Sequence, residues 1–180
     1  MASLEYLLHF DIDKRNFTIV DVDEDGHKLQ QYNRLLFCDS KKRIWAGGEM
    51  GISVFNQVGT SLLPNTDFQI ASVLKQAFVN CFYETSSGYL WIGTRNGLFA
   101  LKESDKQFLQ YTTENGLPSN VIYGILEDAY GRLWISTNQG LSCLNPESGK
   151  FRNFTIMDGL QGNQFNACLL YTSDAADDLI

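Results

Sequence analysis

The segment "GRLWISTNQGL" (131–141) places Trp134 between two aliphatic residues, with a glycine near each end. Side chains that alternate around a large aromatic residue are typical of a β-strand. Gly131 and Gly140 can adopt the positive φ that tight turns need. The segment therefore predicts a strand that a tight turn bounds on each side.

The same motif occurs twice more, as "GYLWIGTRNGL" (88–98) and, more loosely, as "KRIWAGGEMGI" (42–52). The three tryptophans, Trp45, Trp91 and Trp134, are 46 and 43 residues apart. This spacing lies within the period of four-stranded propeller blades. No stretch of ten or more residues keeps a helical apolar stripe, so we expect no long helix.

A fourth apolar segment and a polar connector follow each of the last two motifs, at 107–121 and 150–165. The fold class predicted is all-β: a partial β-propeller of about three four-stranded antiparallel blades, with a partial blade at the N-terminus. Within one domain, 1–167, the expected parts are a blade end at 6–22, blades at about 31–70, 78–113 and 121–156, and a connector at 157–166.

Each recurring residue has a structural interpretation. The first turn of the motif contains Gly88 or Gly131, and the second contains Gly51, Gly97 or Gly140. In the first repeat Lys42 takes the place of Gly88, so that turn should be built differently or carry strain. The tryptophans could stack on a ligand, but their regular recurrence within strands favours core packing.

The pattern "EDAYGRLWISTNQGLSCLNPESGKFRNFTIMDGL" (127–160), with "LWIGT", "NGL" and "GLPSN", closely resembles the two-component regulator propeller repeat. The resemblance covers roughly 6–166 and is weakest where "SLLPNTDFQIASVLKQ" (61–76) replaces the usual connector. It implies the periplasmic sensor region of a hybrid histidine kinase, which senses glycan-derived ligands and is a homodimer in the full-length receptor. Its partners would be an oligosaccharide or other small polar ligand, and the remaining blades of its own propeller.

Two other propeller functions stay open, an interaction scaffold and a lyase-like or glycosidase-like enzyme. We expect no enzymatic activity of this segment, because it contains no nucleophile elbow, Walker loop or GxGxxG motif. His9 and His27 have no recognisable catalytic partner, and no cofactor or catalytic residue is predicted. The formal net charge of −7 argues against a nucleic-acid partner.

Alternate connections of an antiparallel sheet emerge at opposite ends of its strands. The hairpins 94–97 and 137–140 should therefore lie beside the connectors. Amides, hydroxyls and a guanidinium suit sugar hydroxyls or a uronic acid, although Asn and Ser also recur in loops for turn chemistry alone. The candidate ligand-binding residues are Arg95, Asn96, Asn115, Ser119, Asn120, Asn138 and Gln139, with Glu49 and Met50 at the same position of the first repeat.

Three other features have simpler interpretations. "DVDEDG" (21–26) copies half of a calcium loop, but Tyr32 stands where the loop needs a bidentate Glu, so we expect an acidic turn and no metal site. Asp128 is predicted to cap its turn. The end of the chain, 168–180, includes "CLLYTSDAADD" (168–178), which resembles translated sequencing-adapter sequence. We expect this tail to be non-native.

The four cysteines show no metal-ligand spacing, and we expect them to be buried, unpaired thiols. They are Cys38, Cys81, Cys143 and Cys168.

Overall fold

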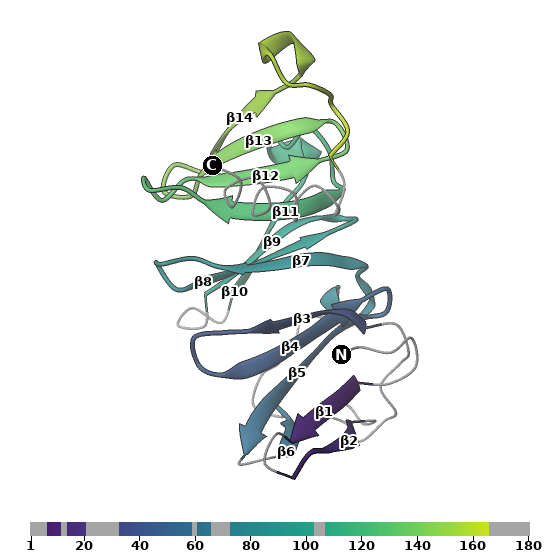
Figure 1. Ribbon diagram of the computed structural model, residues 1–180. Coiled ribbons are helices and arrows are strands. Elements are labelled where there is room, and N and C mark those ends of the chain that lie inside the picture. Colours follow the sequence, from purple (N-terminus) through teal and green to yellow (C-terminus); the bar gives the residue numbers. More distant parts are fainter. Residues whose placement is uncertain are drawn as a thin grey trace, which may run out of the picture. The chain divides into compact units, whose positions relative to one another are not determined.

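The computed structural model describes residues 7–11, 14–20, 33–58, 61–65, 73–102 and 107–165. Its strands form one two-stranded hairpin and three four-stranded antiparallel sheets (Figure 1). Strand order follows chain order in each sheet, as in propeller blades. The predicted all-β fold, a partial β-propeller, is confirmed. The acidic segment 21–26, Tyr32, His27 and the tail 168–180 lie outside the described residues.

The chain divides into two compact units, 1–79 and 80–180. In the first unit, β1 (Leu7–Asp11) pairs with β2 (Asn16–Val20). Its four-stranded sheet contains β3 (Asn33–Cys38), β4 (Arg43–Gly48), β5 (Gly51–Val58) and β6 (Ser61–Pro64), followed by a 3-10 turn, η1 (Leu74–Gln76). Buried Ala46 and Phe55 form its core, with Ile44 and Leu62 packed against them.

The second unit contains two sheets. The first consists of β7 (Val79–Glu84), β8 (Tyr89–Thr94), β9 (Gly97–Lys102) and β10 (Gln107–Tyr111). The second consists of β11 (Ile122–Glu127), β12 (Leu133–Thr137), β13 (Gly140–Asn145) and β14 (Lys150–Phe154). A 3-10 turn follows each outer strand, η3 (Thr113–Asn115) and η4 (Ile156–Asp158).

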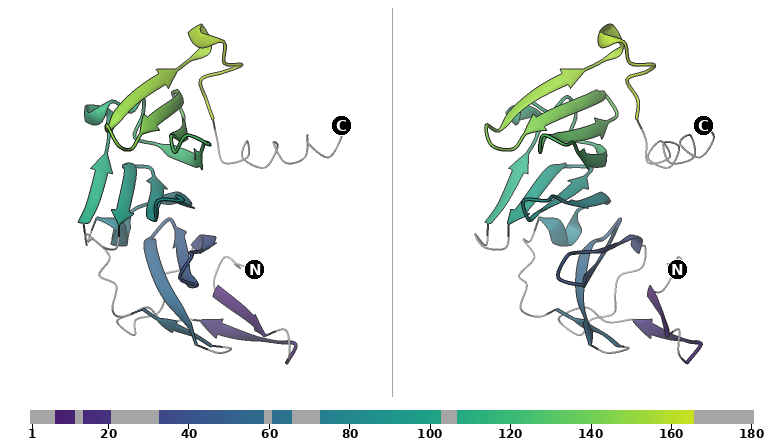
Figure 2. Two further views of the ribbon diagram at one scale, coloured as in Figure 1. Left: turned by 90° about the vertical axis from the view of Figure 1, so that its left-hand side faces the viewer. Right: turned by 60° about the vertical axis from the view of Figure 1, so that its left-hand side comes forward.

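The two sheets of the second unit stand side by side (Figure 2). Strand β8 packs against β11. Gly93 makes this approach possible, because a Cβ there would lie 2.8 Å from Cγ2 of Ile122. Asn80 Nδ2 donates a hydrogen bond to the Ile122 carbonyl over 2.7 Å and ties the innermost strands together. Trp91 joins Ile122 and Leu133 in one buried cluster. Core packing of Trp91 is confirmed.

The other two tryptophans differ in burial. Trp45 is only 1% exposed, whereas Trp134 is half-buried. The expectation of core packing therefore holds fully for Trp45 and partly for Trp134.

Lys42 adopts the same left-handed turn as its glycine counterparts. Its φ is 61°, against 80° for Gly88 and 72° for Gly131. In all three turns this residue donates its N–H to the carbonyl three residues earlier, that of Asp39, Thr85 or Asp128. Of the two alternatives for this turn, the strained one is observed.

Cys38 contradicts the prediction of buried thiols. It is exposed, whereas Cys143 is buried and Cys81 is partly buried. Cys38 is the last residue of β3, next to the turn that follows it, and at this strand end its side chain is open to solvent. All three are unpaired, and Cys168 lies outside the described residues.

None of the helices in the described ranges is long and apolar enough to cross a membrane.

Candidate functional site

One end of the strands, which we call the connector side, carries the β8–β9 and β12–β13 hairpins and the connectors. The Gly97 N–H donates to the Asn120 carbonyl over 2.8 Å, and the Gly140 N–H donates to the Asn163 carbonyl over 2.6 Å. Each hairpin is thus fixed to the connector that follows its sheet. The predicted proximity of hairpins and connectors is confirmed.

Three of the candidate ligand-binding side chains hold the connector together. The Oδ1 atoms of Asn115 and Asn120 accept backbone N–H groups of Thr112 and Thr113, each over 2.8 Å. Ser119 Oγ accepts the Val121 N–H over 3.1 Å. Their side-chain oxygens therefore perform turn chemistry.

The next connector repeats this arrangement. Asp158 accepts the Thr155 N–H over 2.9 Å, and Asn163 accepts the Ile156 N–H over 2.8 Å. Both turns form a capping box, which satisfies the backbone donors at the start of each 3-10 turn. The sequence motifs "TTENGL" and "TIMDGL" are the signal for this element.

The other candidate side chains lie at the hairpin tips. Arg95 and Asn96 are exposed on the β8–β9 hairpin, and Gln139 is exposed on the β12–β13 hairpin. Asn138 is half-buried, and its Oδ1 is buried without a hydrogen-bond partner in the described part of the chain. The structure thus distributes the candidates over matching ends of two packed sheets. Glu49 and Met50 belong to the first unit.

The opposite end of the strands, which we call the turn side, carries a cluster of hydrogen bonds around the Asp128 carboxylate. Asp128 Oδ1 accepts the backbone N–H groups of Tyr130 and Arg132, as predicted for a turn cap. Its Oδ2 also accepts Nε of Arg132 over 2.7 Å and Nε1 of Trp134 over 2.9 Å. Desolvation acts to raise the pKa of Asp128, but these hydrogen bonds outweigh it and lower the pKa to about 2.

The first unit contains the same cluster. Asp39 Oδ2 accepts Nε of Arg43 over 2.6 Å and Nε1 of Trp45 over 2.9 Å. Desolvation opposes these bonds, and the pKa of Asp39 is nevertheless lowered. Sequence reasoning missed the indole contact. The signal was an Asp six residues before Trp and an Arg two before it in two of the repeats.

The middle repeat lacks this cluster because Thr85 takes the place of the aspartate and Tyr89 that of the arginine. Thr85 Oγ1 accepts the Tyr89 N–H over 3.1 Å and contacts Ser87 Oγ at 3.0 Å. Nε1 of Trp91 is buried and has no hydrogen-bond partner in the described ranges. Burying an unpaired N–H is unfavourable, which makes this position exceptional.

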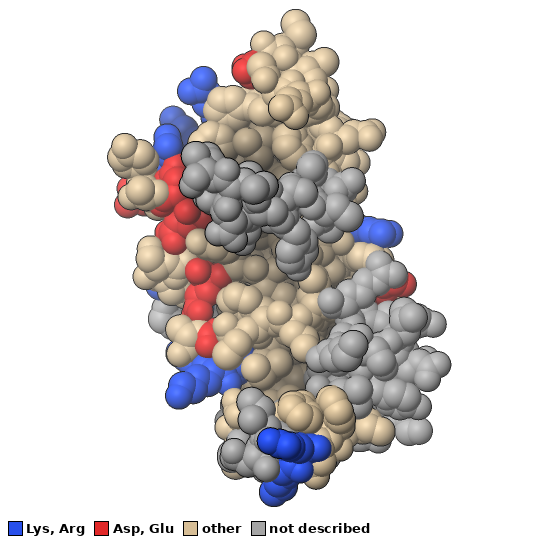
Figure 3. Space-filling model, viewed as in Figure 1, with Lys and Arg blue, Asp and Glu red and all other residues tan. Residues whose placement is uncertain are grey.

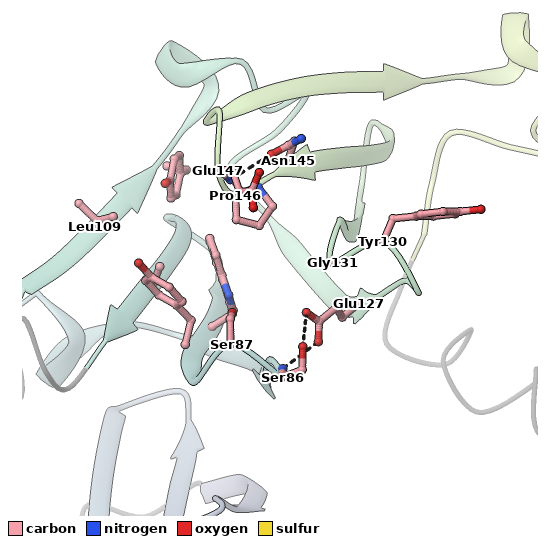
Figure 4. Close-up of a pocket in the computed structure, with 13 residues that line it drawn as sticks. Ser86, Ser87, Leu109, Glu127, Tyr130, Gly131, Asn145, Pro146 and Glu147 are labelled. Carbon is pink, nitrogen blue, oxygen red and sulfur yellow. Dashed lines mark hydrogen bonds between the residues drawn. The ribbon is translucent and has the colours of Figure 1, made fainter.

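A pocket of about 320 Å³ lies beside Trp91 on the turn side, between the two sheets of the second unit (Figure 4). Ser86 closes it at one side, where its N–H and Oγ donate to Glu127 over 2.9 and 3.0 Å. The pocket is lined by Ser86, Ser87, Tyr89, Trp91, Ala100, Leu109, Tyr111, Glu127, Tyr130, Gly131, Asn145, Pro146 and Glu147.

Aromatic rings and acidic groups dominate the pocket. The Trp91 ring stacks on Tyr111 with centroids 5.9 Å apart and lies 6.2 Å from the Tyr89 ring. Desolvation, with a smaller contribution from Tyr89, raises the pKa of the Tyr111 hydroxyl, so it stays protonated. Figure 3 shows Asp and Glu side chains gathered over the ends of the strands on the turn side. In the described part of the chain, no three His, Cys, Asp or Glu residues are grouped to hold a metal ion.

Residues 74–96 and 116–139 match the family described as "Two component regulator propeller". A comparison with curated proteins gave no match.

Among solved structures, the extracellular domain of BT3049 from B. thetaiotaomicron, described as a hybrid two component system, is 26% identical over 89% of this chain and 24% of its own, with a TM-score of 0.60. The extracellular domain of BT4673 from the same organism is 27% identical over 73% of this chain and 20% of its own, with a TM-score of 0.57. A second structure of BT4673 has a TM-score of 0.65 at 17% identity, over 85% of this chain and 23% of its own, and supports the fold alone. The chain spans about a quarter of the length of these structures or less. Two segments of the chain therefore match the two-component regulator propeller repeat, and the chain shares its fold with the extracellular domains of BT3049 and BT4673.

Proposed function

We propose that this chain is part of the extracytoplasmic ligand-sensing propeller of a two-component receptor. Its ligand is glycan-derived, and the segment itself catalyses no reaction. In the full-length receptor it functions as a homodimer beside the remaining blades. The repeat match and the 26–27% identity to extracellular domains support this proposal.

The observation that carries the proposal is the anchoring of the hairpins to the connectors. The bonds from Gly97 to Asn120 and from Gly140 to Asn163 fix the backbone beneath Arg95, Asn96 and Gln139. Side chains on a fixed backbone lose less conformational freedom when a ligand binds. Loops on rigid scaffolds commonly carry function.

The side chains on the connector side suit an acidic sugar. The Arg95 guanidinium can bind a carboxylate in a bidentate manner. Asn96 and Gln139 can both donate to and accept from sugar hydroxyls. We therefore place a uronic acid unit of the ligand at the β8–β9 hairpin.

Calorimetry of the 180-residue chain with neutral and uronic-acid oligosaccharides tests the proposal. We expect a uronic-acid oligosaccharide to bind and Arg95→Ala to weaken it about tenfold or more. Arg152→Ala is the matched control, because Arg152 is an exposed arginine of the same unit on β14. Absence of binding to every oligosaccharide, or equal losses in both variants, contradicts the proposal.

The enzyme alternative has its own readout. Chromatography of the same oligosaccharides after prolonged incubation with the protein should show no new products. A cleaved product would favour the lyase-like or glycosidase-like function instead.

A further inference from the structure

We propose that the turn-side pocket of the second unit is a second binding site, which takes a neutral saccharide unit whose hydroxyl oxygen accepts a hydrogen bond from Trp91. It is distinct from the connector-side site, since the two lie at opposite ends of the same strands. The two sites also differ in charge, because Arg95 contributes to one and carboxylates line the other. The inference therefore stands or falls separately from the proposed function.

The indole N–H of Trp91 has no hydrogen-bond acceptor among the described residues. In the two other motifs the equivalent indole N–H donates to a carboxylate over 2.9 Å. Thr85 cannot replace that carboxylate, because its shorter side chain is engaged by the Tyr89 N–H and Ser87. A ligand oxygen placed against Trp91 supplies the contact that the other sheets make internally.

The turn beside Trp91 allows such an approach. Trp91 is only 2% exposed and its N–H is buried, yet it is one of the residues that line the pocket. The neighbouring residues Ser86, Ser87 and Gly88 are exposed, and a Cβ on Gly88 would meet nothing within 4 Å. In the proposed site, movement of this exposed turn gives a ligand oxygen access to the indole N–H.

The remaining walls suit one sugar ring. Trp91, Tyr89 and Tyr111 present aromatic carbon against which the C–H groups of a pyranose can pack, as in sites that combine an apolar body with a few polar groups. The volume of about 320 Å³ is at the low end for small-molecule pockets. A single ring with its hydroxyls is therefore the expected occupant.

The charge of the walls selects against acidic sugars. Glu127 and Glu147 line the pocket, and no Lys or Arg is among its lining residues. Figure 4 shows Asn145 and Glu147 across the pocket from Ser86 and Glu127. Both oxygens of Glu127 are engaged by Ser86, and Oδ1 of Asn145 accepts backbone N–H groups of Glu147 and Ser148. The Glu147 carboxylate and the Asn145 Nδ2 group are the ones that would meet ligand hydroxyls. Like charges would repel a sugar carboxylate here.

Nuclear magnetic resonance of the indole N–H groups gives a site-specific test. The chain has three tryptophans and therefore three indole cross-peaks, of which Trp91→Phe identifies one. The probes are methyl glucoside, methyl galactoside, methyl mannoside and methyl xyloside, with methyl glucuronide as the acidic comparison. We expect at least one neutral glycoside to shift the Trp91 cross-peak and leave those of Trp45 and Trp134 in place.

Thr85→Asp tests the missing acceptor directly. The new carboxylate can accept the Trp91 indole N–H as Asp128 accepts that of Trp134. We expect a higher melting temperature, a Trp91 cross-peak closer to the other two, and binding weakened about tenfold or more. Thr85→Ser is the matched control that keeps the hydroxyl, and it should bind like the unchanged protein. Should Thr85→Asp fail to fold, Ser87→Tyr fills the pocket from its exposed rim and should weaken binding to a similar degree.

Three outcomes would overturn the proposal. The first is an unmoved Trp91 cross-peak at high millimolar concentrations of every neutral glycoside, and the second is tighter binding of the glucuronide than of any neutral probe. The third is undiminished binding by Thr85→Asp or, where that variant does not fold, by Ser87→Tyr. Arg95→Ala should leave this site unaffected, so loss of connector-side binding and loss of pocket binding can be told apart.

Discussion

Nε1 of Trp134 donates to Oδ2 of Asp128 over 2.9 Å, and the same carboxylate accepts from Arg132 and from two backbone N–H groups of its turn. The Asp128 side chain thus joins a turn, an arginine and a half-buried indole. The same geometry occurs between Asp39 and Trp45. The cluster is therefore a repeated device that fixes the first turn of a sheet to its tryptophan.

This cluster should make the stability of the protein sensitive to acid. The pKa of Asp128 is about 2 in the folded chain against an ordinary value of 3.8, and the pKa of Asp39 is lowered too. The unfolded chain therefore binds protons at a higher pH than the folded chain does. Stability should be fully present above about pH 4 and fall as the pH decreases toward 2.

Thermal unfolding from pH 6 to pH 2 checks this dependence, because that range spans the ordinary pKa of an aspartate and the lowered pKa of Asp128. Asp128→Asn should lower the melting temperature at neutral pH and flatten its fall in acid. Glu114→Gln, which changes an exposed carboxylate on the connector, is the control. An unchanged acid profile in Asp128→Asn would show that the cluster does not set it.

Gly93 should be essential for the packing of β8 against β11. A Cβ there would overlap Cys81 Sγ and approach Cγ2 of Ile122 to 2.8 Å. Gly93→Ser should therefore cost about 1–3 kcal/mol of unfolding free energy, the usual range for overpacking.

The next sheet indicates how to rescue that variant. There Gly124 of β11 is paired with Ser136 of β12. These positions correspond to Cys81 and Gly93, so in this sheet the glycine is on the first strand and the larger residue is on the second. Cys81→Gly together with Gly93→Ser should recover much of the loss. Denaturant unfolding of both single variants and the double variant gives the coupling energy. Additive losses would mean that the two positions do not share one space.

Replacement of Lys42 by glycine should stabilise the first unit. Its φ of 61° is a conformation that costs an ordinary residue about 1–2 kcal/mol, whereas glycine adopts it readily. Because glycine also loses more backbone entropy on folding, we expect a net gain of about 0.5–1 kcal/mol for Lys42→Gly. Denaturant unfolding measures it, and Lys41→Gly in the same turn should give no gain.

The cysteines should differ sharply in reactivity. Burial raises the pKa of the Cys81 thiol to about 12 and also raises that of Cys143, so neither forms the reactive thiolate near neutral pH. Cys38 is exposed. Mass spectrometry after iodoacetamide treatment of Cys168→Ser should find only Cys38 modified in the folded chain and all three thiols modified in denaturant. Rapid labelling of Cys81 in the folded chain would show that its sheet opens.

The sequence by itself determined the strands and their order. Alternating side chains around each tryptophan, with turn residues such as Gly131 and Gly140 beside them, specify hairpins through contacts that are local along the chain. The repeat of that unit then specifies sheets of four strands, because neighbouring strands in the chain are neighbours in the sheet. The turn cap at Asp128 follows from the same local chemistry.

Only the tertiary structure decided what these units can bind. Sequence reasoning named the polar residues of the connector side, but Asn115, Ser119 and Asn120 prove to hold their own backbone. It did not find the pocket, because Ser86 and Glu127 are 41 residues apart in the sequence and meet only when the two sheets pack together. Whether an indole N–H has a hydrogen-bond partner depends on which atoms the packed sheets bring within about 3 Å of it. The repeat pattern of the sequence does not contain that information.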